Sequence, residues 1–335
     1  MNDKRIKNIP SVTICVPVYC VEKYIERCAV CIFEQTYENL SYIFVDDCST
    51  DRSMDILHKV ILRYPQKKYR VKIIKHKVNR GLAAARNTAV KAVSTPFLFN
   101  LDSDDTIHPR TIELLVRKQL ETDADIVTSA VVRQMPNGKL KTTIFSEISS
   151  NEKEWCCRLL SREIPVCVWG RLIRTSLYHE NQIYAKEGVN MCEDYHVISR
   201  LAYFANRMDY ENKAEYYYNC QNMYSITSVI SESKFNQQLE SLDILYDFFQ
   251  DKDFVFIESY FCGAAKLLAE ITMNCCRSGN HDYFNKRIKA KLQETKKQYI
   301  GAVPWIYRIA FYLPWFRFLN IYANIGHLIK KCHFL

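Results

Sequence analysis

Short apolar runs alternate with amphipathic segments along the first part of the chain. Five runs rich in β-branched or aromatic residues have the length of buried strands: 12–18, 41–46, 71–75, 97–101 and 126–133. The segments between them repeat apolar residues at helical spacing: 22–35, 53–64, 82–92 and 109–122. This β-α-β series predicts an α/β fold with a Rossmann-like, doubly wound, mostly parallel sheet.

The pattern changes twice beyond the last of these strands. Pro136-Asn137-Gly138 is typical of a hairpin turn, which would add a small antiparallel part to the sheet. From Glu232 onward apolar residues recur at helical spacing. We therefore expect an α/β domain over 1–230, a helical extension over 231–300 and a basic, aromatic tail over 301–335.

The net charge of +9 is unevenly distributed. Residues 286–335 carry ten Lys and Arg against Glu294 alone, so the rest of the chain is neutral overall. A nucleic-acid enzyme would carry its positive field around the active cleft. We expect no nucleic-acid partner.

Fourteen cysteines would suggest disulfides in a small secreted protein. Residues 1–9 are polar and charged rather than a signal peptide, so we expect a reducing cytoplasm. Cys28 and Cys31 form a C-x-x-C without a second pair at zinc spacing, and we interpret them as small buried hydrophobes.

Polar side chains follow three of the predicted strands. Ligands of open α/β sheets bind at the carboxyl ends of the strands, and these ends carry Pro17-Val18-Tyr19, Asp46-Asp47 and Asp102-Ser103-Asp104. Hard cations such as Mg²⁺ bind through one or two carboxylates plus substrate phosphates. The Asp-x-Asp triplet on its own also fits a solvated turn.

The sequence motifs of several classes of nucleotide-binding protein are absent from this chain. None of the eight glycines builds G-x-G-x-x-G or a P-loop, which disfavours hydride transfer and the common ATPases and GTPases. A nucleotide-sugar pyrophosphorylase is a nearer rival, although it too would need a glycine-rich, basic first loop. A non-catalytic binding protein is the second rival.

A series of motifs closely resembles the family 2 glycosyltransferases of the GT-A fold. The motifs are residues 12–19, Gln35-Thr36-Tyr37, residues 45–51, residues 79–87, residues 101–105, Val168-Trp169-Gly170-Arg171, Glu193-Asp194 and Ser225-Ile226-Thr227. Their order and spacing are more specific than any single motif. The resemblance covers about two thirds of the chain.

The resemblance implies an inverting transfer of a sugar from a nucleotide-sugar, commonly a UDP-sugar, to an acceptor hydroxyl. Pro17 and Tyr19 would line the base pocket, Asp47 would accept from the uracil ring nitrogen, Asp102 would lie by the ribose and Asp104 would ligate Mn²⁺ or Mg²⁺. Further donor-site candidates are Val18, Glu22, Asp46, Asn79 and Ser103.

Two charged positions complete the expected site. Arg86 would place a second positive group on the donor, or it would be an exposed helix arginine. Asp194 matches the family's general base, which takes the acceptor's proton. Without the resemblance, Glu193-Asp194 would be acidic residues at a helix N-terminus. His196 is an alternative base, although a lone histidine in a helical pattern is more often structural.

Two positions depart from the family's pattern. Cys20 stands where the family often has Asn. Asn219-Cys220-Gln221 precedes Ser225-Ile226-Thr227 where the family often has an arginine, which weakens the expectation of an arginine on the diphosphate from this loop.

The tail combines aromatic and basic residues. The tail is interrupted by Arg308, Pro314 and Arg317, so it lacks a continuous apolar run long enough to span a bilayer. Trp305, Ile309 and Leu313 instead favour an interfacial helix on an anionic membrane surface. We expect a peripheral protein on the inner face of the cell membrane, with a glycan or lipid-linked acceptor in cell-surface polysaccharide or glycoconjugate synthesis. The alternatives are a tail packed on the domain and a homodimer contact.

Overall fold

The computed structural model describes residues 9–145, 152–222 and 231–278. The chain forms two compact units. The first comprises residues up to Trp155 together with Val166–Ile226, and the second comprises Cys156–Pro165 together with residues from Thr227 onward. The expected boundary at residue 230 and the expected tail over 301–335 lie outside the described residues.

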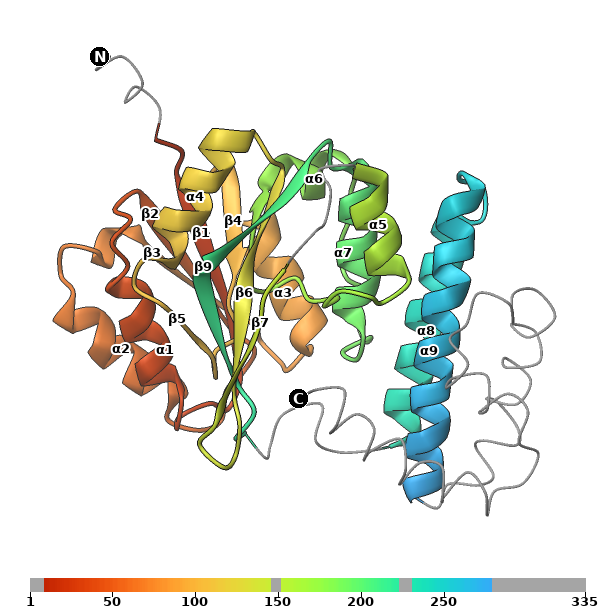
Figure 1. The fold of residues 1–335 in the computed structure, drawn as a ribbon. Helices are drawn as coiled ribbons and strands as arrows, with labels where there is room; N and C mark the ends of the chain where they lie inside the picture. The colour runs from red at the N-terminus through yellow and green to blue at the C-terminus, as the bar shows by residue number, and fades with distance from the viewer. Residues whose placement is uncertain (1–8, 146–151, 223–230, 279–335) are drawn as a thin grey trace, which may run out of the picture. The chain divides into compact units, whose positions relative to one another are not determined.

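A parallel sheet forms one half of the first unit (Figure 1). Its four strands lie in the order β3-β2-β1-β4: β3 (Val71–Lys75), β2 (Leu40–Asp46), β1 (Val12–Val18) and β4 (Phe97–Asn100). Their bounds agree with the strands predicted from the apolar runs. The carboxyl ends of β1, β2 and β4 therefore meet at one edge of the sheet, as predicted.

The other half of the sheet is of mixed direction. Strand β8 (Arg171–Arg174) lies antiparallel between β4 and β6 (Ile126–Gln134), and β9 (Met208–Asn219) pairs with β6 in parallel. The short β5 (Thr106–Ile107) pairs with β9. Strand β7 (Leu140–Thr143) pairs with β6 across the predicted hairpin turn. The predicted fold class is confirmed, but the antiparallel part is larger than the hairpin alone.

Helices cover both faces of the parallel strands. Alternate residues of β1, such as Val12 and Ile14, point into an apolar core shared with α1 (Ile25–Phe33), α2 (Ser53–Arg63) and α4 (Thr111–Thr122). Helix α3 (Leu82–Lys91) packs against β1 and β2 through small side chains, because Ala83, Ala84, Ala85 and Ala89 are all buried. The four helices agree with the predicted amphipathic segments.

The remaining elements of the first unit connect these layers. They are η1 (Lys68–Arg70), α6 (Thr175–Glu180) and α7 (Glu193–Phe204). A further helix, α5 (Glu152–Leu160), crosses the sequence boundary between the units.

The second unit contains two long helices, α8 (Glu232–Phe249) and α9 (Phe254–Ser278). Ser231 caps α8 by accepting a hydrogen bond from the backbone N–H of Lys234. Tyr246 and Phe249 of α8 contact the rings of Tyr260 and Phe256 of α9. In the described part of the chain, no helix combines the length and apolarity needed to cross a bilayer.

Candidate active site

The residues after β1 and β2 form the first side of the candidate site. Pro17 and Val18 are buried at the end of β1, whereas Tyr19 is 48% exposed. The Asp46 side chain accepts a hydrogen bond from the backbone N–H of Ser49 at 2.8 Å and thereby closes the turn after β2. Glu22 accepts from the backbone of Arg52 at 3.2 Å. Of these candidates, Tyr19 offers an exposed ring that a base can contact.

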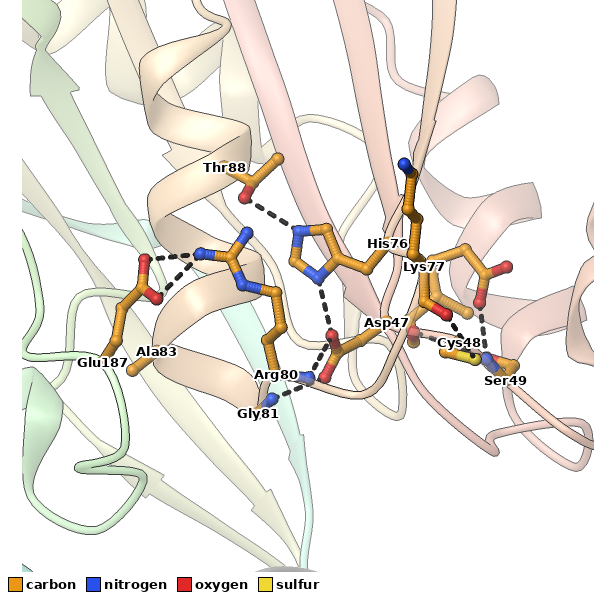
Figure 2. A network of polar contacts seen from close by, with 12 residues as sticks. Asp47, Cys48, Ser49, His76, Lys77, Arg80, Gly81, Ala83, Thr88 and Glu187 are labelled. Atoms are coloured by element: carbon orange, nitrogen blue, oxygen red, sulfur yellow. Dashed lines mark hydrogen bonds and ion pairs between the residues drawn. The ribbon is translucent and has the colours of Figure 1, made fainter.

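Asp47 is the centre of a polar network (Figure 2). One oxygen of its carboxylate accepts from the backbone N–H of Arg80 at 2.9 Å, and the other accepts from Gly81 at 2.7 Å. Nδ1 of His76 lies 2.6 Å from the first oxygen, and Nε2 lies 2.9 Å from the hydroxyl of Thr88. With its side chain only 3% exposed, Asp47 is held in one orientation by three protein groups.

The loop before α3 needs a glycine where it meets this carboxylate. Gly81 has φ +86°, and a Cβ there would lie 2.5 Å from the side chain of Asn190. Asn190 in turn accepts from the backbone N–H of Ala83 at 3.0 Å in the first turn of α3. Arg80 forms an ion pair with Glu187 at 2.7 Å (Figure 2). Residues 187–190 thus fix the start of α3 from outside, while Asp47 fixes it from within.

Arg86 on α3 is buried among three carboxylates. Its guanidinium donates to Asp102, to Glu193 and to Asp194, each at 2.6 Å, while its side chain is only 7% exposed. The alternative of an exposed helix arginine is therefore wrong. The guanidinium already binds carboxylates from both sides of the site. Its predicted contact with the donor stays a prediction.

The environment of this cluster raises the pKa of Asp194. Burial raises the pKa of its carboxyl from 3.8 to about 7, with Arg86 acting in the opposite direction and Glu193 adding to the rise. Burial also raises the pKa of Glu193. A carboxylate whose pKa lies near neutrality is suited to take a proton from a hydroxyl in the transition state.

A tyrosine on β9 orders the acidic loop after β4. The backbone N–H of Asp102 donates to the hydroxyl of Tyr216 at 3.2 Å, and this hydroxyl donates to Asp105 at 2.6 Å. Asp105 also accepts from the backbone N–H of Asn219 at 2.7 Å. Asp105 and Tyr216 are not among the site residues predicted from the sequence, because the pairing of their distant segments gives no local signal.

An aromatic stack supports this tyrosine. The Trp169 ring stacks on Tyr216 with centroids 4.5 Å apart and on Tyr218 with centroids 5.3 Å apart. Gly170 has φ +68°, and a Cβ added at this position would lie 3.0 Å from the side chain of Ser129 and 3.3 Å from that of Tyr216. The Trp-Gly pair of the motif therefore serves close packing beside the acidic loop.

Asp104 is the residue best placed to hold a cation. Its carboxylate accepts from the side-chain amide of Asn222 at 2.7 Å, and burial raises its pKa, with Asp102 adding to the rise. Neighbouring Ser103 is buried. Within the ranges that the structure describes, no three His, Cys, Asp or Glu side chains cluster as metal ligands. A desolvated carboxylate bonded to a neutral amide fits a divalent ion completed by substrate phosphates.

His196 has a structural environment. The ring is buried, and Nε2 accepts from the backbone N–H of Lys186 at 3.1 Å. Burial lowers its pKa to about 3. These contacts favour a structural role over that of a general base. Asn79, by contrast, is exposed in the loop before Gly81.

Comparison with known proteins finds similarity to glycosyltransferases. The model of glycosyl transferase family 2 matches residues 13–172. The glycosyltransferase GlyA of Streptococcus pneumoniae is 27% identical over 217 residues, which are 62% of this chain and 30% of GlyA. EpsH of Bacillus subtilis is 30% identical over 213 residues, which are 62% of this chain and 60% of EpsH. The chain thus spans less than two thirds of these relatives.

Solved structures share the fold. The Staphylococcus aureus TarS 1–349 complex with UDP-GlcNAc has a TM-score of 0.60 at 20% identity, covering 96% of this chain and 92% of that one. The Pyrobaculum calidifontis mannosyltransferase PcManGT, in complex with GDP-Man and Mn²⁺, has a TM-score of 0.53 at 16% identity, covering 97% and 88%. The family match identifies residues 13–172 as a glycosyl transferase family 2 domain, and the solved structures show that the chain shares their GT-A fold.

Proposed function

We propose that this protein is an inverting, metal-assisted glycosyltransferase that moves a sugar from a UDP-sugar to an acceptor hydroxyl. The Arg86 network carries the proposal, because Asp102 from the expected donor side and Asp194 from the expected acceptor side bind one guanidinium. A donor phosphate and an acceptor proton would then be handled by adjoining groups. The nucleotide-sugars in the TarS and PcManGT complexes support this substrate class.

Each side of the site has a separate task in this proposal. Pro17, Tyr19 and Asp47 hold the base, and Asp102 lies by the ribose. Asp194 accepts the acceptor's proton as the hydroxyl oxygen attacks the anomeric carbon from the face opposite the leaving diphosphate. A single displacement of this kind inverts the anomeric configuration.

Asp104 is the proposed ligand of Mn²⁺ or Mg²⁺. Such an ion stabilises the negative charge that develops on the departing diphosphate. The Asp104→Ala variant should lose Mn²⁺-dependent UDP binding in calorimetry and keep its fold, because its carboxylate bonds only to the Asn222 amide among described side chains. Asp251→Ala, at an exposed position of the second unit, is the matched control. Undiminished Mn²⁺-dependent binding in Asp104→Ala would refute the assignment.

We further propose a glycan or lipid-linked acceptor, used in cell-surface polysaccharide synthesis at the inner face of the membrane. The basic aromatic tail over 301–335, which lies outside the described residues, would contribute membrane affinity. Truncation after Gln298 should then reduce binding to anionic liposomes and leave donor hydrolysis intact. Unchanged liposome binding would contradict this role of the tail.

Donor hydrolysis measured across a panel of nucleotide-sugars, with and without Mn²⁺, tests the activity itself. Release of UDP from one UDP-sugar, dependent on the metal, is the expected result. Hydrolysis of none of the panel, by protein that is folded and binds UDP, would favour a binding protein over an enzyme. Formation of pyrophosphate from a sugar phosphate and UTP would instead identify a pyrophosphorylase.

A further inference from the structure

The charge of the first unit is concentrated in one segment. Between Arg52 and Arg80 the chain carries ten Lys and Arg residues and a single acidic residue, Asp55. This segment alone has a net charge of +9, although residues 1–285 as a whole are neutral. The remaining residues of 1–285 therefore carry a net charge of −9, so positive and negative charges are unevenly distributed along this part of the chain.

This segment forms an outer side of the sheet. It comprises α2, η1 and β3, and β3 pairs only with β2 among the described strands, which makes it an edge strand (Figure 1). The inward faces of α2 and β3, including Leu57 and Ile73, contact the apolar core. The charged residues of both elements are nonetheless exposed: Asp55, Lys59 and Arg63 on α2, and Lys72 and Lys75 on β3.

Some of these cations are already paired. Arg52, Arg63 and Arg80 form ion pairs with Glu22, Glu26 and Glu187. Four exposed lysines make no ion pair within the described residues: Lys59, Lys68, Lys72 and Lys77. These four, spread over the helix, the turn, the edge strand and the following loop, are available to an anionic partner.

Exposed apolar side chains lie along the same segment. Leu62 is 66% exposed, Tyr69 is 75% exposed and Val78 is 63% exposed. Single exposed apolar residues need no explanation, but here three accompany an excess of nine positive charges. A polyphosphate chain would require the lysines alone, whereas a lipid bilayer binds both kinds of group at its interface.

Protection of the sheet edge accounts for only part of this pattern. Lysines on an edge strand prevent pairing with another chain, which would explain Lys72 and Lys75. It would not explain Lys59 on the helix or Lys68 in the turn. We propose that α2, η1 and β3 form a docking surface for an anionic lipid bilayer, separate from the C-terminal tail.

Vesicle binding by the full-length chain tests this surface. The triple variant Lys59→Gln, Lys68→Gln, Lys72→Gln should bind phosphatidylglycerol-containing vesicles about 10²-fold more weakly, from roughly five-fold per lysine at an anionic surface. The matched control, Lys91→Gln, Lys139→Gln, Lys213→Gln, removes the same charge from exposed positions outside the segment. It should bind as the unmodified chain does.

The outcomes separate the alternatives. Equal vesicle binding by the two triple variants would overturn the proposal, as would a failure of the unmodified chain to bind. Loss of binding to a DNA oligonucleotide, with vesicle binding unchanged, would identify a polyanion site instead. Leu62→Ser, which should weaken vesicle binding at high salt, tests the apolar contribution. None of these readouts requires transferase activity, so the surface and the proposed function can fail independently.

Discussion

Replacing Asp194 with Asn separates the cost of burying a carboxylate from its use in catalysis. Asp194 is 17% exposed and lies 2.6 Å from the guanidinium of Arg86, which it shares with Glu193 and Asp102. One cation thus faces three carboxylates. Burial raises the pKa of Asp194 to about 7, and Asn keeps the shape of the side chain while removing the titration.

The first expected effect is on the rate. A proton acceptor must be ionised, so kcat/KM of the unmodified enzyme should fall as the pH drops below about 7. Asp194→Asn should lower kcat by about 10² or more and abolish this acidic limb, while UDP affinity changes little. Initial rates between pH 5 and pH 9, with donor binding followed by calorimetry, measure both quantities.

The second expected effect is on stability and has the opposite sign. The carboxyl titrates near 3.8 in the unfolded chain and near 7 in the folded one, so between these values the folded chain binds more protons. The unmodified protein therefore loses stability as the pH rises through this window, by up to about 4 kcal/mol. Asp194→Asn lacks this loss. Its stability relative to the unmodified protein should rise from pH 4 to pH 7 and then level off.

Urea unfolding at pH 5 and pH 8 measures this difference, with Glu193→Gln as the neighbouring control. An identical pH dependence of stability in the unmodified protein and Asp194→Asn would refute the pKa argument. If Glu193→Gln abolished transfer and Asp194→Asn did not, the role of general base would belong to Glu193.

Substitutions at three further positions test the Asp47 network and its surroundings. Gly81→Ala should lower the free energy of unfolding by about 2 to 4 kcal/mol, because the new Cβ meets Asn190 at a φ that favours glycine; an unchanged urea midpoint would contradict this. Cys48, at φ +63°, is strained, and Cys48→Gly should gain about 0.5 to 1 kcal/mol in the same assay, whereas a loss would show that its thiol contributes more than the backbone strain costs. His76→Leu removes a hydrogen bond from Asp47 and should weaken UDP binding about tenfold, while His76→Asn, which can place an amide N–H where Nδ1 lies, should restore much of it; equal affinities of the two variants would show that this hydrogen bond does not position Asp47.

The parallel half of the sheet was predictable because its strands carry continuous apolar runs. Strands buried on both faces, such as β1 and β2, have little polar alternation, and the helices between them show a clear apolar stripe. Strand β9 escaped prediction because it is largely polar, with tyrosines between charged residues. Strand β8 has only four residues, two of them arginines. Neither strand has the composition that marks a buried strand from sequence alone.

The candidate site was predictable as a set of motifs but not as a network. The resemblance placed Asp47, Asp102 and Asp194 among the functional candidates, because each lies in one of the family's motifs. The contacts of Asp47 with His76 and Gly81 depend on how the loop before α3 folds back. The role of Asp105 depends on Tyr216, more than a hundred residues away in the chain. Such contacts follow from strand pairing, which the local sequence does not encode.

Arg86 shows most clearly why the environment of a charged residue cannot be inferred from its own segment. Helix α3 is rich in alanine, and on a surface helix its single arginine would point into water. The small side chains instead let α3 lie close to β1 and β2, so Arg86 is enclosed rather than exposed. A buried guanidinium requires anionic partners, and Asp102, Glu193 and Asp194 supply them from two distant segments. Because three carboxylates exceed the one cation, burial is only partly compensated, and this imbalance keeps the pKa of Asp194 near neutrality.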